Sequence, residues 1–252
     1  MPLALDHIVI AVADLDRAMV DYRALGFQVL PGGQHPGRTS HNALVVFADG
    51  AYLELIAWRA PAPEERWYRT LSAHGEGLVD YALLPADTTQ ALAEAQARGL
   101  HTLTGPLDGG RLRPDGAQLR WQTARHATPD VPFLCGDLTP RALRVPEGSV
   151  RQHPNGAQRV AEVTVAVHNL DATLARYRAL LGLADTVTPV EGTARLQLGR
   201  TVLTLETASG EEALQLLEAS PDIALLISDL MLPGALSGAD VIHTARRRFP
   251  AL

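Results

Sequence analysis

Apolar and polar positions along the first sixty residues predict five elements in the order β-α-β-β-β. The first strand is rich in β-branched side chains, and the pattern then changes to a helical period between an Asp that can cap the helix and a Gly that ends it. Two later apolar runs flank an Asp-Gly pair, which is the strongest short signal for a β-hairpin. The expected elements are a strand at residues 5–12, a helix at 15–25, a short strand at 27–30, and strands at 43–48 and 51–57.

The same order of elements is predicted twice more along the chain. The second set comprises a strand at 77–84, a helix at 88–98, and weaker strands near Thr102, at 118–123 and at 131–135. The third set comprises a strand at 160–167, a helix after Asn169, and strands at 193–198 and 201–205. The third set repeats the first at a constant offset, because Val12 matches Val167 and Tyr22 matches Tyr177. A long internal repeat outweighs local propensity, and it predicts a structure built from copies of one unit.

Two connecting segments complete this region of the chain. Residues 61–72 predict a helix containing Trp67 and Tyr68. Residues 141–155 are rich in Pro, Gly and Arg, and we interpret them as a linker before the third unit.

Glu54 is the first candidate functional residue. Period-two alternation in its strand places Tyr52, Glu54 and Ile56 on one face. A carboxylate among such residues is costly to bury unless it is paired or binds a metal. Pairing with an arginine such as Arg38 is the alternative explanation for its presence.

Composition limits the classes of function. The 252 residues carry a net charge of −6, contain one cysteine and contain no lysine. The missing lysine excludes Schiff-base chemistry and a P-loop lysine, and the acidic balance disfavours nucleic acid as a partner. The single cysteine excludes an internal disulfide framework. With no membrane-length apolar run and no basic secretory segment, we expect a cytoplasmic protein.

The repeated units and the motif GGxHP…HNALV…DGAYLELIA resemble the vicinal oxygen chelate superfamily, which includes glyoxalases, bleomycin-resistance proteins and extradiol dioxygenases. The motif falls on residues 32–57 and is similar to that of the glyoxalase-like subfamily. The resemblance implies an α+β fold in which β-α-β-β-β modules form half-barrels. It implies paired modules in residues 1–150, a third module in 156–207, and a short α/β tail in 208–252.

In that superfamily a divalent metal is held by residues on the first and last strands of each module. Carried over to this chain, the resemblance implies a Zn, Mn, Fe or Ni site with the candidate ligands His7, Glu54 and Glu162. Glu162 is equally consistent with a solvent-facing strand residue. The corresponding positions of the second module are Asp80 and Cys135, and Thr204 matches Glu54 in the third module. None of these restores the usual ligands of the superfamily, and both Asp80 and Cys135 are consistent with packing positions.

The same motif suggests residues that bind a substrate. His41, Asn42 and Arg38 are candidates for binding substrate polar groups, whereas His35 is expected to shape its turn. The resemblance then implies a metal-dependent lyase, isomerase or dioxygenase that acts on a small oxygen-bearing molecule. Glu54 would act as metal ligand or as general base. The alternative is a binding protein that sequesters a small molecule without chemistry.

Residues 208–252 resemble part of a response-regulator receiver domain, with Asp229 at the phosphoacceptor position. The acidic pair that binds Mg²⁺ in such domains is missing, and so is their lysine. Phosphoryl transfer needs the Mg²⁺ ion and the lysine cation to neutralise the transferred group. We therefore predict that Asp229 is not phosphorylated efficiently and that this segment is a fusion remnant or the product of a truncated gene. The alternative is a signalling fusion in which the tail regulates the barrel. The open edge of the third unit predicts either a homodimer or coverage by this tail.

Overall fold

The computed structural model describes residues 3–183, 187–207 and 227–228, and their secondary structure is mixed α+β as expected. The strands of the first part are β1 (Ala4–Ala11), β2 (Leu30–Gln34), β3 (Ser40–Val46), β4 (Tyr52–Trp58), β5 (Gly77–Leu84), β6 (Leu103–Leu112), β7 (Gln118–His126) and β8 (Phe133–Asp137). The helices are α1 (Leu15–Ala24), α2 (Arg66–His74), α3 (Thr88–Ala97), α4 (Arg141–Arg144), the 3-10 turn η1 (Ser149–Arg151) and α5 (Leu170–Leu181). The later strands are β9 (Glu162–Val167), β10 (Thr193–Leu198), β11 (Thr201–Thr207) and β12 (Ile227–Ser228).

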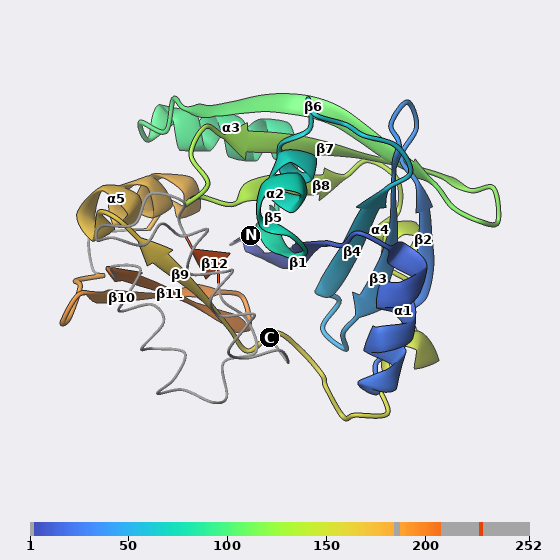
Figure 1. Cartoon of the computed structure of the whole chain (residues 1–252). Helices are drawn as coiled ribbons and strands as arrows, with labels where there is room; N and C mark the ends of the chain where they lie inside the picture. Colours follow the sequence, from blue (N-terminus) through green and yellow to red (C-terminus); the bar gives the residue numbers. More distant parts are fainter. Residues whose placement is uncertain (1–2, 184–186, 208–226, 229–252) are drawn as a thin grey trace.

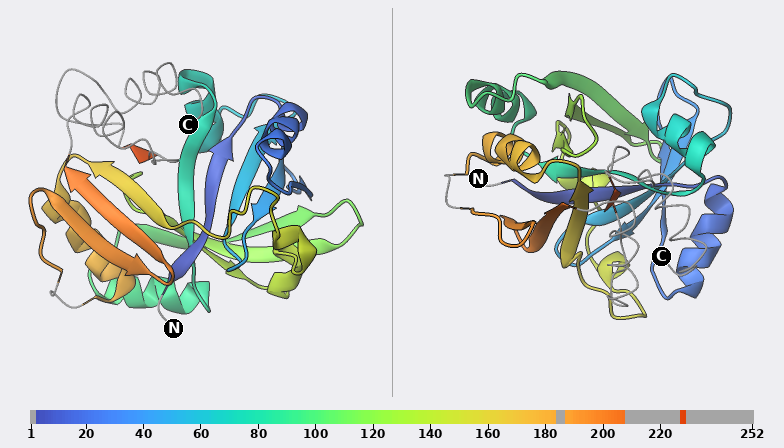
Figure 2. Two further views of the ribbon diagram at one scale, coloured as in Figure 1. Left: turned by 90° about the horizontal axis from the view of Figure 1, so that it is seen from below. Right: turned by 60° about the vertical axis from the view of Figure 1, so that its left-hand side comes forward.

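The first eight strands form a closed barrel in the order β1-β4-β3-β2-β6-β7-β8-β5 (Figure 1). Each half of the barrel is one β-α-β-β-β module, in which the first and last strands pair in parallel, as β1 does with β4 and β5 does with β8. The halves meet along the antiparallel ladder between β1 and β5. On the other side they meet through a single residue pair, Gln34 with Leu112, between β2 and β6. The two views in Figure 2 show the strands of the barrel wrapping around a common interior.

Helix α1 shows why this sequence produces the predicted elements. The Asp14 side chain accepts a hydrogen bond from the Arg17 amide at 3.0 Å, which caps the helix as its position predicts. Leu15 and Met19 are buried and belong to a core that includes Leu55 on the outer face of the barrel. Since successive strand residues point to opposite faces, burying Leu55 outside sends Glu54 inside.

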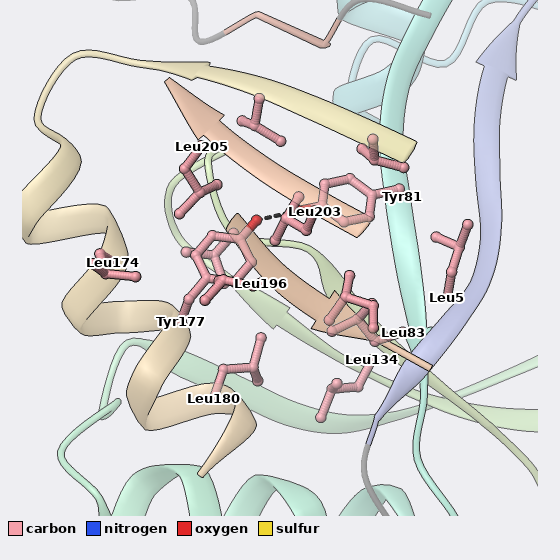
Figure 3. Close-up of a cluster of buried hydrophobic side chains, with 14 of the residues drawn as sticks. Leu5, Tyr81, Leu83, Leu134, Leu174, Tyr177, Leu180, Leu196, Leu203 and Leu205 are labelled. Carbon is pink, nitrogen blue, oxygen red and sulfur yellow. Dashed lines mark hydrogen bonds between the residues drawn. The ribbon is translucent and has the colours of Figure 1, made fainter. Parts of the chain in front are cut away.

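The third unit forms a second sheet beside the barrel, in the order β10-β11-β9-β12. Its helix α5 and its strands pack on the outer face of the barrel through one large apolar cluster (Figure 3). At the centre of this cluster the hydroxyl groups of Tyr81, from β5, and Tyr177, from α5, are hydrogen-bonded to each other. The labelled leucines of the cluster are Leu5, Leu83, Leu134, Leu174, Leu180, Leu196, Leu203 and Leu205. The third unit is thus a lateral support for the barrel wall rather than a part of the barrel.

Three sequence expectations need correction. Strand β2 begins at Leu30 rather than covering residues 27–30, because its backbone pairs with the β3 strand only from Leu30 onward. Helix α2 begins at Arg66, several residues after the expected start at residue 61. The expected linker at 141–155 contains α4 and η1, and its residues Arg144 and Val145 are buried.

Most of the receiver-like tail, with Asp229, lies outside the described residues. Its described strand β12 pairs in parallel with β9, with Ile227 opposite Val165 and Ser228 opposite Ala166. This contact places part of the tail along the edge of the third unit. Among the residues that the structure describes, no helix is both long enough and apolar enough to cross a membrane.

Candidate functional site

The site is built around His7 on β1 and Glu54 on the neighbouring strand β4. The parallel ladder pairs His7 with Tyr52 and Val9 with Glu54, so both side chains face the barrel interior. The Nε2 atom of His7 lies 3.4 Å from Oε2 of Glu54, and both residues are buried. The structure therefore brings together the imidazole and the carboxylate that the motif suggested.

The ring of His7 is held in one orientation from three sides. Its Nδ1 atom lies 2.7 Å from Oδ2 of Asp6. Tyr52 stacks on the ring with centroids 4.6 Å apart, and Phe133 meets it edge-on at 5.4 Å. Because Asp6 occupies Nδ1, the ring presents Nε2 to Glu54. A register shift in the β1–β5 ladder between Leu5 and His7 explains how two consecutive residues are both buried in this way.

Asp6 is anchored by two arginines from helix α4. Nη1 of Arg144 lies 2.7 Å from Oδ2 of Asp6, and Nη1 of Arg141 lies 2.6 Å from Oδ1. Burial would raise the pKa of Asp6, but Arg144, His7 and Arg141 outweigh it and lower the pKa of this carboxyl well below its usual range. Asp6 is therefore ionised, so the proton shared with His7 resides on Nδ1. The segment that looked like a linker in the sequence thus supports the site.

Glu54 is surrounded by groups that favour its ionised form. The Nδ2 group of Asn42 donates to Oε1 at 2.5 Å, and Nε2 of His35 lies 3.8 Å from the same oxygen. Burial raises the pKa of Glu54, yet the neighbouring His7 and His35 and the Asn42 hydrogen bond lower it below its ordinary value. Glu54 is consequently a carboxylate at neutral pH.

His35 is a site residue that the sequence reasoning assigned to a turn. Its Nδ1 atom lies 3.0 Å from the Ser40 hydroxyl, and its ring meets Trp121 edge-on at 6.2 Å. Burial lowers the pKa of His35, so its imidazole is neutral at neutral pH. Its position within the GGxHP motif was a signal that could have identified it.

Gly32 explains the first glycine of that motif. A Cβ atom at this position would lie 2.1 Å from Oδ1 of Asn42 and 2.8 Å from Nη1 of Arg111. Only glycine leaves room for Arg111 to reach Asn42, to which its Nη1 donates at 3.3 Å. Sequence reasoning missed Arg111, which lies in β6 of the other module and is 3% exposed.

The second half of the barrel carries different chemistry at the corresponding positions. Asp80 stands where His7 stands in the first half, and it is bound by Arg66, by Trp67 Nε1 at 2.9 Å and by the Tyr81 amide at 2.9 Å. These contacts use the carboxylate of Asp80 for an ion pair within the second module.

The alignment of Cys135 with Glu54 is wrong. Val9 pairs with Glu54 in the first module, and its counterpart Ala82 pairs with Phe133 in the second. The position equivalent to Glu54 is therefore Phe133, two residues before Cys135. Burial raises the pKa of the Cys135 thiol to about 12, which keeps it protonated.

Arg125, from β7, adds a cation to this second half. Its guanidinium lies 4.7 Å from the ring centroid of Trp67 and 4.9 Å from that of Phe133. Within the described part of the chain no carboxylate lies within ion-pair distance of Arg125. Burial and the proximity of Arg125 lower the pKa of Arg66 to about 10. The second half is thus cationic and aromatic.

Three predicted site residues, His41, Arg38 and Glu162, lie outside the cluster around Glu54. His41 is on the face of β3 opposite to Asn42, where partial burial and the charge of Arg59 lower its pKa despite the opposing charges of Asp16 and Asp14. Strand alternation prevents adjacent residues 41 and 42 from both facing inward, so the structure does not place His41 in the site. Arg38 is 58% exposed and pairs with Glu65 at 3.5 Å rather than with Glu54.

Glu162 does not join the cluster around Glu54. It starts β9 in the second sheet, where it is hydrogen-bonded by Thr204 and lies 3.3 Å from Arg195. Its ladder register agrees with the internal repeat, because Thr164 pairs with Thr204 as Val9 pairs with Glu54. The repeat therefore identified equivalent positions, but these positions lie in separate sheets.

The donor set decides whether a divalent metal fits. His7 and Glu54 offer one nitrogen and one carboxylate, with Asp6 orienting the imidazole as in many metal sites. The remaining positions hold Phe133 and an Asp80 already bound to Arg66. In residues 3–183 and 187–207, no three His, Cys, Asp or Glu side chains are grouped to hold a metal ion. The residues present do not fit a complete divalent-metal site.

Comparison with solved structures shows the fold. A hypothetical protein from Staphylococcus aureus is similar with a TM-score of 0.64 and 17% identity, covering 82% of this chain and 86% of that one. Methylmalonyl-CoA epimerase from Mycobacterium tuberculosis is 20% identical over 54% of this chain and 89% of its own, with a TM-score of 0.41. A Streptomyces coelicolor methylmalonyl-CoA epimerase in complex with 2-nitronate-propionyl-CoA is 22% identical over 55% of this chain and 100% of its own, with a TM-score of 0.40.

Comparison with protein families gives the relationship of the sequence. No curated protein matches this chain. The family described as "Glyoxalase-like domain" matches residues 5–181, which include the barrel and the first strand and helix of the third unit. The resemblance deduced from the motif is confirmed, and the chain belongs to the glyoxalase-like domain family.

Proposed function

We propose that this protein is an enzyme that transfers a proton at a carbon atom next to an oxygen group of a small molecule, as an isomerase or a lyase. The observation that carries the proposal is the buried, ionised Glu54 carboxylate facing Nε2 of His7, whose other nitrogen is fixed by Asp6. A carboxylate held in this way is a proton acceptor placed in a water-poor interior.

The three residues form a path for the proton. Glu54 takes the proton from the substrate carbon, and His7 Nε2, at 3.4 Å, accepts a proton from Glu54. Asp6 remains ionised and stabilises the imidazolium that results, since Arg144 and Arg141 hold its charge. The substrate oxygen gains negative charge in this step, and the guanidinium group of Arg125 is the interior cation suited to stabilise it.

The metal-dependent form of this chemistry, as lyase or dioxygenase, would require a divalent ion at His7 and Glu54. Such an ion would take its other ligands from water or from the substrate, because the second module supplies none. The donor set therefore favours the metal-free form. Metal analysis of the purified protein, before and after treatment with a chelator, tests this choice.

The main experiment measures exchange of hydrogen for deuterium in D₂O at carbons adjacent to a carbonyl group. A panel of small hydroxy and keto acids and aldehydes is incubated with the protein and followed by NMR. Glu54→Gln should slow the exchange by about 10²–10⁴-fold, whereas Glu162→Gln, which alters a carboxylate in the second sheet, should keep the wild-type rate. Exchange at the wild-type rate in Glu54→Gln would exclude the proposal.

A non-catalytic binding protein is the second candidate. The observation that favours it is the incomplete second half, where Phe133 stands at the position of Glu54. This candidate predicts ligand binding with no exchange in the wild-type protein. The deuterium experiment separates the two candidates directly.

A further inference from the structure

A cleft of ≈ 240 Å³ lies between strands β2, β3 and β6 and the segment that contains α4 and η1. One arginine of β6 and a wall of apolar side chains define its chemistry. These residues are Arg111, Leu30, Leu44, Leu143, Pro146 and Val150. Its volume is below the range of roughly 300–1,000 Å³ that is usual for drug-sized ligands, so it suits a smaller molecule.

Arg111 is a buried cation without a counter-charge. Its Nη1 and Nη2 groups donate to neutral oxygens, the Asn42 side chain at 3.3 Å and the Arg144 carbonyl at 3.2 Å. Its Nε group has no partner in the described part of the chain. No carboxylate among the described residues forms an ion pair with it. A buried charge of this kind is costly unless an opposite charge compensates it.

The two other arginines of the same cleft are compensated. Arg144 contacts Asp6 at 2.7 Å and Asp137 at 2.5 Å. Arg113 lies 2.7 Å from Asp115. The charge imbalance of the cleft is therefore that of a single guanidinium, and it corresponds to one negative charge on a ligand.

We infer that this cleft binds the carboxylate group of a small organic acid, with Arg111 as its counter-ion and the apolar wall around its carbon chain. As a substrate subsite the inference rests on the proposed function, but the binding itself does not. Asn42 connects the two places, because its Oδ1 accepts from Arg111 and its Nδ2 donates to Glu54. An acid bound to Arg111 is thus separated from Glu54, the proposed proton acceptor, by the side-chain amide of Asn42.

Butyrate is the probe, since it joins one carboxylate to a short apolar chain. Butyrate should raise the Tm of the wild-type protein by about 2–4 °C for each kcal/mol that its binding adds to the free energy of unfolding. Butyramide, which lacks the charge, should not raise it, and inorganic phosphate, which lacks the chain, should raise it less. Isothermal titration with the same three compounds provides the binding constants.

Arg111→Met is the decisive variant. It should lose the stabilisation by butyrate, and it should unfold at a higher temperature than the ligand-free wild type because the uncompensated charge is gone. Arg120→Met, which removes an exposed arginine of β7, should respond to butyrate as the wild type does. Equal stabilisation of Arg111→Met and wild type would overturn the inference.

Val150→Trp tests the cleft independently of Arg111. Val150 is half-buried in η1 and lines the cleft. The indole ring of tryptophan at this position would fill the cleft from the side opposite to Arg111. This variant should lose butyrate binding with Arg111 in place, and retained binding would overturn the inference even if Arg111→Met failed to fold. Glu54→Gln should keep butyrate binding, so loss of catalysis and loss of the anion site are distinguishable.

Discussion

The two halves of the barrel have the same topology and opposite chemistry. In the first half, His7 and Glu54 occupy the interior positions of the parallel strand pair, and in the second half Asp80 and Phe133 occupy them. The first half combines a carboxylate with two imidazoles, whereas the second combines arginines with aromatic rings. The repeat therefore fixes where interior side chains stand, while each module determines separately what those side chains can do.

Neutralising each interior carboxylate in turn is the strongest test of this difference. Glu54→Gln should reduce proton transfer by about 10²–10⁴-fold, the usual contribution of a positioned acid or base. Asp80→Asn should change the rate far less, because Asp80 is bound to Arg66 and Trp67, and should mainly lower stability. Exchange rates and urea unfolding of both variants measure the two effects. Equal losses of activity would show that the halves are not functionally distinct.

The anchor of the first half should dominate stability. Asp6→Asn removes the charge that Arg144 and Arg141 share, and breaking a buried pair of this kind costs about 3–5 kcal/mol. The corresponding residue of β5 is Val79, so the second half has no such anchor. Asp108→Asn, whose carboxylate lies exposed at 3.9 Å from Arg120, serves as a control and should cost under about 1 kcal/mol. Denaturant unfolding of both variants gives the values.

The two halves become more alike if the second half gains a metal ligand at Phe133, the position equivalent to Glu54. Phe133→His places an imidazole at the position equivalent to Glu54, next to the ring of His7. We expect this variant to bind Zn²⁺ more tightly than the wild type, because three protein ligands complete an open tetrahedral site. Competition with a chromophoric chelator measures the affinity. Phe133→Leu is the control, and unchanged zinc affinity in Phe133→His would contradict the structural equivalence.

The smallest expected effect concerns pH. Burial lowers the pKa of His35, so the unfolded chain binds a proton more readily than the folded protein. The folded protein therefore loses stability as pH falls below the unfolded value of about 6.5 toward the lower folded value. His35→Asn should make this dependence shallower between neutral and mildly acidic pH. Unfolding free energies measured across that range in both proteins test the sign, and identical slopes would contradict it.

The sequence predicts the units from local signals and the central pair of the site from the motif. Caps, alternation and the repeat define the strands, and the resemblance to the superfamily places His7 and Glu54 on the first and last strands of one module. Arg111 and Arg144 could not be predicted in this way. Their partners Asn42 and Asp6 are 69 and 138 residues away, and only the closed barrel brings them together.

Two errors of prediction have simpler physical reasons. Choosing His41 together with Asn42 neglects alternation, which sends adjacent strand residues to opposite faces. Matching Cys135 rather than Phe133 to Glu54 is an error of two residues in the register of the last strand. The connections before β8 differ in length from those before β4, so only the ladder between β5 and β8 fixes the register.

The seam between β2 and β6 is the weakest junction of the barrel wall. Seven of the eight strand junctions are ladders of two or more residue pairs, and this one is a single rung, Gln34 with Leu112. Separating the wall along that line would break the fewest backbone pairs of any junction in the barrel. Gly32 and Arg111 lie beside this rung, one on each strand, so a local opening of the seam would expose the guanidinium and, behind it, the Asn42 amide that contacts Glu54.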